Sequence, residues 1–405
     1  MNAWPRAVWW IFTARVARMF AYGLLGVVLV LYLSEAGLDT PRIGLLLSLT
    51  LLGDAALSLW LSTRADVWGR RRTLAVGAWL MGLGGAGMAL TGDFGWLLVA
   101  ATIGVISPTG GEVGPFLAVE QAALAQVTPD RDRTKVFAWY NVVGYAATAL
   151  GALAAGAIVE SLQASGVRPV SSYRVVLVGY GAIGIVLLLL NLRLGAEVES
   201  PATADGKKRI LGLGESRGIV LRLSALFSVD SFAGGFIVQS FLVWWFHQRY
   251  GVGEAALGAV FFGANLLSGL SALAAVPLAR RIGLVNTMVW THLPSNVLLM
   301  LVPLMPSFGW AAAVLLLRHT ISQMDVPTRQ SYVNAVVPAP ERAAANGVTG
   351  TARQLGTALA PLLMAPLLAL APGAPFFAAG GLKIAYDLAL WRSFRAVKPP
   401  EEAAR

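Results

Sequence analysis

The sequence contains no cysteine, and only 13% of its 405 residues are charged. Without thiols the chain forms no disulfide and no cysteine-ligated metal site. Its three histidines, His247, His292 and His319, lie far apart, so we expect no metal or other cofactor. The motif G-x-x-x-x-G-K-[ST] is absent, which excludes an ATP-driven pump within this chain. We find no cluster of nucleophile and base either, and predict that the chain is not an enzyme.

Apolar residues are abundant instead. They make up 57% of the chain, and the mean hydropathy is +0.67. Runs near the ~20 residues that a helix needs to cross a bilayer recur from end to end. We therefore predict an all-α integral membrane protein with twelve transmembrane helices, over residues 7–34, 43–63, 73–91, 96–125, 136–158, 174–193, 219–246, 254–277, 284–304, 308–335, 345–371 and 375–394. The first run lacks a small-residue cleavage site, so we expect a retained span and not a signal peptide.

The longest polar interval, residues 195–218, divides these spans into two equal sets. We predict two six-helix bundles, over 1–194 and 219–405, joined by this interval as a cytoplasmic linker. A shift of 214 residues brings Gly69 onto Gly283 and the first Phe-Gly-Trp tripeptide (94–96) onto the second (308–310). The two bundles are therefore predicted to be pseudo-symmetric, as in transporters built from parallel repeats.

The distribution of basic residues predicts the orientation. With the N-terminus in the cytoplasm, 22 of the 31 lysines and arginines, Arg329 among them, fall in cytoplasmic segments and four in outer loops. Cytoplasmic segments of membrane proteins carry such an excess. We expect both termini to be cytoplasmic, in a plasma (inner) membrane, and the chain to act as a monomer. Anionic lipid headgroups account for the net charge of +10, so no nucleic-acid partner is needed.

The segment LSTRADVWGRRRTL, residues 61–74, lies between the second and third spans. The chain resembles the major facilitator superfamily, whose signature in this loop is G-x-x-x-D-R-x-G-R-R/K. Asp66, Gly69, Arg70 and Arg71 match it, whereas Ser62 and Val67 depart from it. A degenerate copy, PLARRIGLVNTM, occupies 277–288 in the second half. The resemblance covers the whole chain and implies a transporter that works by alternating access.

The same resemblance implies that this loop latches the two halves together on the cytoplasmic side. Gly69 permits a tight turn, and Asp66 can accept hydrogen bonds from a helix N-terminus, whose dipole favours an anion. The alternative is that the arginines only set the orientation, which we prefer for Arg72. Asp66 is less easily explained in this way, because a topology signal does not require an acid.

The fifth span resembles the glycine-rich span of proton-driven antiporters. NVVGYAATALGALAAGAIV, residues 141–159, supplies Gly144, Gly151 and Gly156, but Ala152 stands where the family has proline. The resemblance implies efflux by proton antiport, and the small residues permit close helix packing.

Ionisable side chains within spans are costly and mark candidate functional sites. Arg15, Arg18 and Tyr22 share one face of span one, and Asp54 lies near the middle of span two. Glu112 lies in span four between two prolines, where we expect the helix to break and to line a cavity. By resemblance, spans one, four, seven and ten line the transport cavity. The predicted substrate and proton pathway comprises Arg15, Arg18, Tyr22, Asp54, Glu112, Asp230, Arg318, Asp325 and Arg353.

Buried structural ion pairs are the alternative for each of these residues. For Lys383 and Asp387 in span twelve we prefer that alternative, as an i,i+4 pair. His292 and His319 have no evident partner in the sequence. The thirteen tryptophans are interpreted as interfacial anchors.

We therefore expect a secondary active transporter of a small organic or amphiphilic solute, coupled to protons and directed outward. Glu112 is the expected proton carrier, with Asp54 as its rival. A lipid or lysolipid flippase, a proton-coupled importer of an anionic metabolite and a transport-inactive sensor remain alternatives. Which intramembrane charge is unpaired, and hence the charge of the substrate, does not follow from the sequence.

Overall fold

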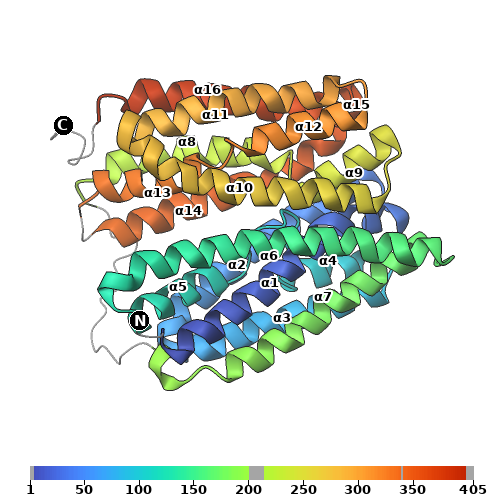
Figure 1. The fold of residues 1–405 in the computed structure, drawn as a ribbon, viewed down its shortest axis with the longest axis horizontal. Coiled ribbons are helices and arrows are strands. Elements are labelled where there is room, and N and C mark those ends of the chain that lie inside the picture. Colours follow the sequence, from blue (N-terminus) through green and yellow to red (C-terminus); the bar gives the residue numbers. More distant parts are fainter. Residues whose placement is uncertain (1–3, 200–213, 339–340, 398–405) are drawn as a thin grey trace. The chain divides into compact units, whose positions relative to one another are not determined.

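A computed structural model describes residues 4–199, 214–338 and 341–397, and all regular structure within these ranges is helical (Figure 1). Contacts divide the described residues into two compact units. The first comprises those of Met1–Ala204 and Val238–Asn265, and the second those of Asp205–Ile237 and Leu266–Arg405. The segment 238–265 lies beyond the polar interval 195–218 in the sequence but packs with the first unit.

The first unit contains the helices of the N-terminal half and two from further along the chain. They are α1 (Arg6–Glu35), α2 (Thr40–Trp68), α3 (Arg70–Leu90), α4 (Phe94–Ile103), α5 (Phe116–Val127), α6 (Asp130–Ala164), α7 (Pro169–Leu192), a short 3-10 helix η1 (Ala196–Val198), α9 (Gln239–Tyr250) and the start of α10 (Glu254–Ile282). Helix α1 packs against α6 and α7 and is buried along most of its length. A Cβ at Gly151 of α6 would collide with the carbonyl oxygen of Phe20, so this glycine allows α1 and α6 to approach closely.

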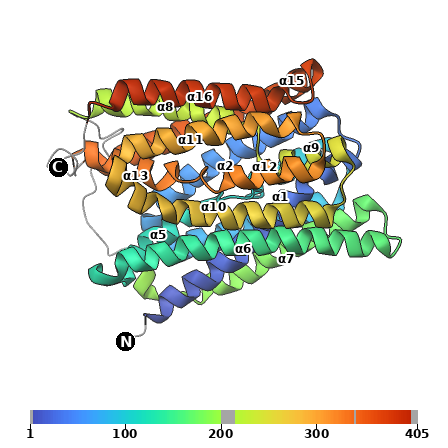
Figure 2. The ribbon, with the colours of Figure 1, turned by 45° about the horizontal axis from the view of Figure 1, so that its top comes forward.

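The second unit is drawn mainly in yellow to red in Figures 1 and 2. It contains α8 (Arg217–Gly235), the remainder of α10, α11 (Leu284–Leu301), η2 (Val302–Leu304), α12 (Phe308–His319), α13 (Asp325–Val336), α14 (Arg342–Leu359), η4 (Ala360–Leu363), α15 (Met364–Leu370) and α16 (Ala374–Phe394). Helix α8 packs against α14, and α11 packs against α16. Phe227, Tyr332 and Tyr386 are buried in the apolar core between these helices.

Nine described helical segments are long and apolar enough to cross a membrane, and α4, α5 and α12 are shorter apolar helices. These shorter helices belong to spans that are interrupted. Span four consists of α4 and α5, and span ten of α12 and α13. Span seven is interrupted between α8 and α9, and span eleven at η4. The prolines and glycines of 106–121 predicted the first interruption, whereas the other three were not expected.

The internal repeat is visible in the helix boundaries. Helices α2 (Thr40–Trp68) and α10 (Glu254–Ile282) begin and end at positions related by the 214-residue shift, and so do the starts of α4 and α12. Gly69 and Gly283 follow α2 and α10 with φ angles of 101° and 87°. Both angles disfavour a side chain, so the same tight turn occurs in both halves.

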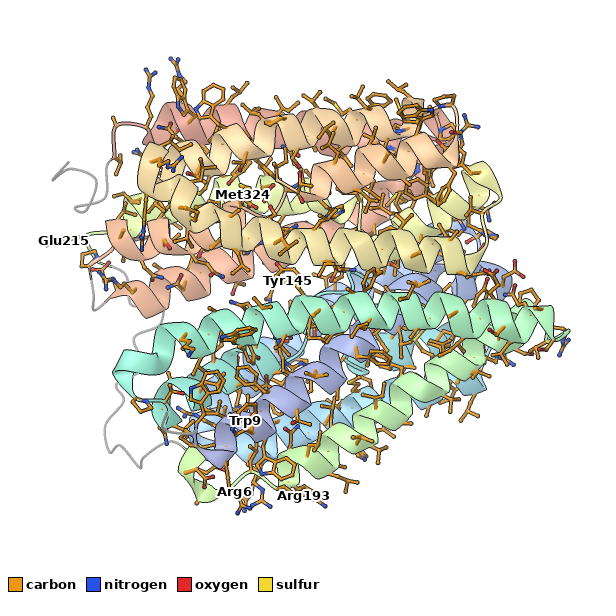
Figure 3. The ribbon with its side chains drawn as sticks, in the orientation of Figure 1. Arg6, Trp9, Tyr145, Arg193, Glu215 and Met324 are labelled. Atoms are coloured by element: carbon orange, nitrogen blue, oxygen red, sulfur yellow. The ribbon has the colours of Figure 1, made fainter. Side chains whose placement is uncertain are left out.

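The chain enters and leaves the first six spans at the same end of the first unit. Figure 3 shows Arg6, Trp9 and Arg193 together there, and the guanidinium of Arg193 lies 5.7 Å from the ring centroid of Trp10. Trp9 is 57% exposed. An exposed tryptophan beside arginines at helix ends is typical of the membrane–water interface.

Candidate functional site

A buried charged cluster lies where α1, α5 and α6 meet. Arg18 of α1 binds Glu120 of α5 through two nitrogens, one of which lies 2.9 Å from Oε2. The Tyr140 hydroxyl of α6 donates to the same Oε2 at 2.5 Å. The Arg18 guanidinium also stacks on the Phe116 ring, 4.6 Å from its centroid. A two-pronged guanidinium–carboxylate pair is among the strongest polar contacts that side chains make.

Glu112 joins this cluster from the interrupted part of span four. Its Oε1 forms an ion pair with Nη1 of Arg15 and lies 3.3 Å from Nη2 of Arg18. Arg15 also donates to the Tyr140 hydroxyl at 3.2 Å and stacks over that ring. The Glu112 side chain is 18% exposed, and its buried Oε2 has no hydrogen-bond partner within the described structure.

Tyr22 and Asp54, both predicted for the pathway, bind the interrupted backbone. The Tyr22 hydroxyl donates to the Val113 carbonyl at 3.1 Å, and Asp54 accepts from the Gly114 N–H at 2.6 Å. Val105, where α4 has ended, has a φ of 51°, a strained angle for a β-branched residue. Its carbonyl accepts from a buried tyrosine of α7. Side chains of three other spans thus satisfy three of the backbone groups freed by the break.

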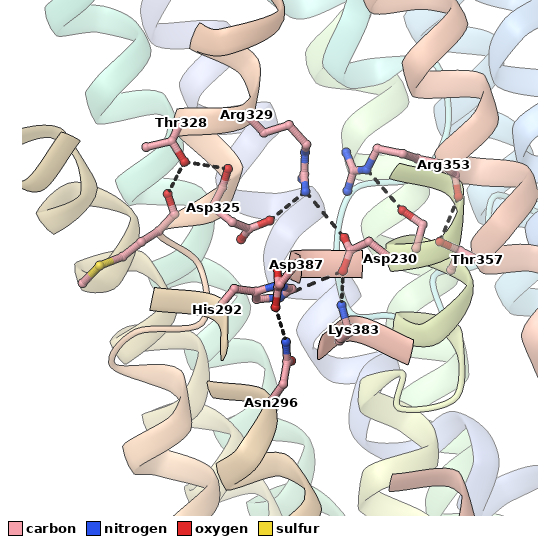
Figure 4. Close-up of polar contacts among 12 residues, drawn as sticks. Asp230, His292, Asn296, Asp325, Thr328, Arg329, Arg353, Thr357, Lys383 and Asp387 are labelled. Carbon is pink, nitrogen blue, oxygen red and sulfur yellow. Dashed lines mark hydrogen bonds and ion pairs between the residues drawn. The ribbon is translucent and has the colours of Figure 1, made fainter. Parts of the chain in front are cut away.

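The second unit contains its own charged cluster (Figure 4). Asp230 of α8 pairs with Lys383 of α16 at 2.5 Å and lies 3.6 Å from Arg329 of α13. Asp325 binds Arg329 at 2.7 Å. Asp387 accepts from Asn296 at 2.9 Å and contacts Nδ1 of His292 at the same distance.

Two expectations about this second cluster, for Lys383 and Arg329, were wrong, and His292 has partners that the sequence did not show. Lys383 binds Asp230 rather than its neighbour Asp387 one turn away. His292, for which the sequence offered no partner, contacts Asp387 and lies 4.0 Å from Asp230. Arg329, counted as a cytoplasmic topology signal, is only 3% exposed and is held by two acids. The sequence did contain a signal for its burial, namely its position within predicted span ten.

Arg318 and Arg353, the two arginines of the second unit that were predicted for the pathway, form no ion pair with a described residue. Nε of Arg353 donates to the Ser231 hydroxyl at 3.2 Å (Figure 4). Arg318 of α12 is 6% exposed, and its buried Nε has no hydrogen-bond partner in the described ranges. His319 contacts the Ser268 hydroxyl through Nδ1 at 2.8 Å, which gives it the partner that the sequence did not show.

The loop after α2 is organised by an acid that the sequence analysis did not single out. The Glu199 carboxylate accepts from the backbone N–H groups of Arg70 at 2.6 Å and Arg71 at 3.3 Å, at the N-terminus of α3. The Arg70 side chain donates to Oε1 of Gln126 at 2.8 Å. The Asp66 side chain, and with it the predicted contact to a helix N-terminus, lies outside the described part of the structure.

A similar carboxylate contact occurs in the second unit. Glu341 accepts from both the hydroxyl and the N–H of Ser216, just before α8. These hydrogen bonds, with others from the Gly214 and Glu215 N–H groups, lower the pKa of the Glu341 carboxyl. A glutamate thus holds the chain to its own unit on each side of residues 200–213: Glu199 in the first unit and Glu341 in the second.

The nine predicted pathway residues divide between the two units. Arg15, Arg18 and Glu112 meet directly, and Tyr22 and Asp54 bind the backbone around Glu112. Asp230 and Asp325 share Arg329, whereas Arg318 and Arg353 form no ion pair with a described acid. The clusters also contain five residues that were not predicted for the pathway: Glu120, Tyr140, Arg329, Lys383 and Asp387. Within the described ranges no three His, Asp or Glu side chains are grouped as metal ligands would be.

The all-helical fold is that of solved membrane transporters. A mutant of the nucleoside transporter NupG superposes with a TM-score of 0.76 at 14% identity, over 96% of this chain and 100% of that one. A POT family transporter in complex with 5-aminolevulinic acid gives 0.75 at 16% identity, over 97% of each chain. A D-xylose–proton symporter gives 0.73 at 14% identity, over 95% of this chain and 97% of that one. At these identities the likeness shows the fold alone.

A family model of the Major Facilitator Superfamily matches residues 11–361, and the chain belongs to this family. It is also 28% identical over 376 residues to an uncharacterized membrane protein of Saccharomyces cerevisiae, YJR124C, across 85% of this chain and 84% of that protein. The predicted fold class, an all-helical membrane protein of two six-helix bundles, is confirmed. The chain is a multi-pass secondary transporter of small solutes and not an enzyme.

Proposed function

We propose that this transporter couples the export of a small organic solute to protons, and that Glu112 carries the proton. The observation that supports this is a difference between Glu120 and Glu112 in how many carboxylate oxygens have a partner. Glu120 accepts from Arg18 with both oxygens and from Tyr140. Glu112 is paired through one oxygen only, and its other oxygen has no described partner. A carboxylate with a free oxygen can exchange its ion pair for a proton more readily than a saturated one.

Protonation of Glu112 removes the charge that attracts Arg15. Arg15 then keeps only the Tyr140 hydroxyl, whereas Arg18 remains bound to Glu120. Release of the proton restores the pair between Arg15 and Glu112. Glu112 would thus take up a proton from one side of the membrane while unpaired and release it to the other side when Arg15 returns. Glu112 lies in the interrupted part of span four, where a change of pairing can move the backbone.

Export rests on the glycines of α6, which resemble those of proton-driven antiporters. A Cβ at Gly144 would lie 2.7 Å from Nη2 and 2.8 Å from Nε of Arg15. Gly144 therefore leaves the space in which Arg15 reaches Glu112, and the glycine pattern is linked to the proposed proton site. Flux measured in right-side-out and inside-out vesicles tests the direction, and solute accumulation driven inward would contradict export.

The remaining predictions are part of the same proposal. The halves 1–194 and 219–405 move relative to each other about the linker, both termini face the cytoplasm of a plasma (inner) membrane, and a monomer is sufficient. Asp66, Gly69, Arg70 and Arg71 form the cytoplasmic gate. The capping of α3 by Glu199 supports an ordered loop at Arg70 and Arg71.

The proton carrier is tested with Glu112→Gln and Asp54→Asn in proteoliposomes. The substrate is first identified by a thermal-shift screen of metabolites, drugs and lipids, since ligand binding stabilises the native state. Glu112→Gln should abolish uphill transport driven by a pH gradient and retain downhill exchange, because glutamine cannot release a proton. Asp54→Asn should impair both, because Asp54 holds the backbone beside Glu112 through Gly114.

Three outcomes separate the alternatives. Full pH-driven accumulation by Glu112→Gln would remove Glu112 as the carrier. Loss of uphill transport with retained exchange in Asp54→Asn alone would assign the proton to Asp54. Lipid scrambling by the wild-type protein, with no flux of a soluble solute, would favour the flippase.

A further inference from the structure

The interruption of span ten contains a set of buried polar side-chain atoms without partners. Arg318 Nε, His319 Nε2 and Ser322 Oγ lack a hydrogen-bond partner in the described structure, and all three atoms are buried. They lie within five consecutive residues, at the end of α12 and in the turn before α13. The Ile321 and Ser322 N–H groups both donate to the Arg318 carbonyl, so Arg318 and Ser322 lie one turn apart.

All three side chains can present donors. A guanidinium has only N–H donors, and a serine hydroxyl has one O–H donor. If the Ser268 hydroxyl donates to Nδ1 of His319, the ring proton is on Nε2, which is then a third donor. An anionic oxygen would supply the hydrogen-bond acceptor that these three buried donors lack.

The excess of basic side chains in the second unit also favours an anionic ligand. Among the cluster residues and the other predicted pathway residues, the first unit has one more acid than base: Asp54, Glu112 and Glu120 against Arg15 and Arg18. The second unit has one more base than acid: Arg318, Arg329, Arg353 and Lys383 against Asp230, Asp325 and Asp387. A buried guanidinium without a counter-charge is strongly unfavourable. Arg318 has no direct ion pair: it is 6% exposed, and Asp325 and Asp230, which attract it at longer range, form their ion pairs with Arg329 and Lys383 instead.

We propose that Arg318, with His319 and Ser322, binds the carboxylate or phosphate group of an anionic solute at the interruption of span ten. This rests on the proposed transport function and assigns the substrate class, which the sequence left open. Arg353, which forms no ion pair with a described residue, adds positive charge to the same cluster. The site would recognise the anionic group, whereas Glu112 in the other unit carries the proton.

The test is ligand binding by the purified full-length protein, without any gradient. The probes are succinate, benzoate and glycerol 3-phosphate, each beside its uncharged counterpart: succinamide, benzamide and glycerol. At least one anion should raise the melting temperature of the wild-type protein, and its counterpart should not. Arg318→Gln should weaken that anion's binding about tenfold or more, as expected for loss of a charged hydrogen bond. Ser322→Ala should weaken it several-fold.

Stability without ligand supplies a second measurement. Arg318→Gln should leave the melting temperature of the ligand-free protein unchanged or higher, because it removes a buried charge that has no direct ion pair. The matched control is Arg329→Gln, a buried arginine of the same unit with two acid partners, which should lower it markedly. If Arg318→Gln is not recovered folded, Arg318→Lys keeps the charge and should still bind the anion more weakly, because the planar contact is lost.

The outcomes separate this site from the transport function. Equal shifts by the anions and their uncharged counterparts, or no shift by any anion, would overturn the site while leaving proton coupling intact. Without ligand, Arg318→Gln could lose as much stability as Arg329→Gln. That result would show that Arg318 has a structural partner and would also overturn the site. Anion binding that depends on Arg318 in a protein without pH-driven flux would retain the site and reject the proposed coupling.

Discussion

At the scale of single residues, buried charges that occupy similar positions differ in the side chains that they contact. Arg15 and Arg18 occupy the same face of α1 and were predicted together. Yet Arg18 is bound by a saturated glutamate and Arg15 by one with a free oxygen. The same contrast separates Arg329, held by two acids, from Arg318, held by none that is described. In the proposed mechanism, such differences separate the charges that stabilise the fold from those that exchange a proton or bind a ligand.

Glu120→Gln should be far more damaging to stability than Glu112→Gln. It leaves fully buried Arg18 without its two-pronged partner, and breaking a buried pair in this way costs roughly 3–5 kcal/mol. Glu112→Gln should cost less, because the side chain is partly exposed and Arg15 keeps Tyr140. Denaturant unfolding of the two purified variants in detergent makes the comparison.

Equal losses of stability in the two variants would mean that the glutamates share one structural role. The proposed assignment of the proton to Glu112 would then lose its physical basis.

At the scale of helices, the repeat gives a matched experiment. Gly69→Ala and Gly283→Ala place a side chain at φ angles of 101° and 87°. Each should lower the free energy of unfolding by roughly 1–2 kcal/mol, the cost of left-handed backbone for an L-residue. Gly179→Ala in α7 is the control, because a Cβ there meets no atom within 4 Å and φ is not positive. It should be neutral or slightly stabilising.

Thermal unfolding of the three alanine variants measures these effects side by side. A loss at Gly69 but none at Gly283 would show that the two turns are not energetically equivalent, despite their related geometry.

Helices were predictable to the extent that their signals are local. Long apolar runs predicted the spans, and Gly69 and Gly283 indicated matching turns. The prolines on either side of Glu112 predicted the interruption of span four. The interruption of span ten has no proline within it, and its signals are the mostly polar residues from His319 to Asp325 and Pro327 in the first turn of α13. Charge partners were not predictable. Lys383 and Asp230, for example, are 153 residues apart, and only the tertiary fold brings them together.

At the scale of the whole molecule, one segment belongs to the second half by sequence and to the first unit by contact. Val238–Asn265 contains α9 and the start of α10. The Ser240 N–H donates to the Pro108 carbonyl at 3.2 Å. Glu254 accepts from the Tyr173 hydroxyl at 2.5 Å. If the halves 1–194 and 219–405 move during transport, these contacts must break and form again in each cycle.

Tyr173→Phe should therefore shift the conformational equilibrium. It removes a hydrogen bond to a buried carboxylate, worth about 1.5–3 kcal/mol, and should increase the population of the state without this contact by roughly 10- to 100-fold. The cysteine-free chain allows a single cysteine at Val252, beside Glu254, to report on this state through its labelling rate. Labelling should be faster in Tyr173→Phe than in the otherwise wild-type reporter protein.

Ser165→Ala is the control for this measurement, because within the described structure that hydroxyl donates to the Ser161 carbonyl at the end of α6, so its loss should leave the labelling rate unchanged. Unchanged labelling in Tyr173→Phe as well would mean that Val238–Asn265 stays packed on the first unit throughout the cycle. The moving parts would then be the units defined by contacts and not the halves of the sequence, because the segment would travel with α6 and α7 instead of with the helices that follow it in the chain.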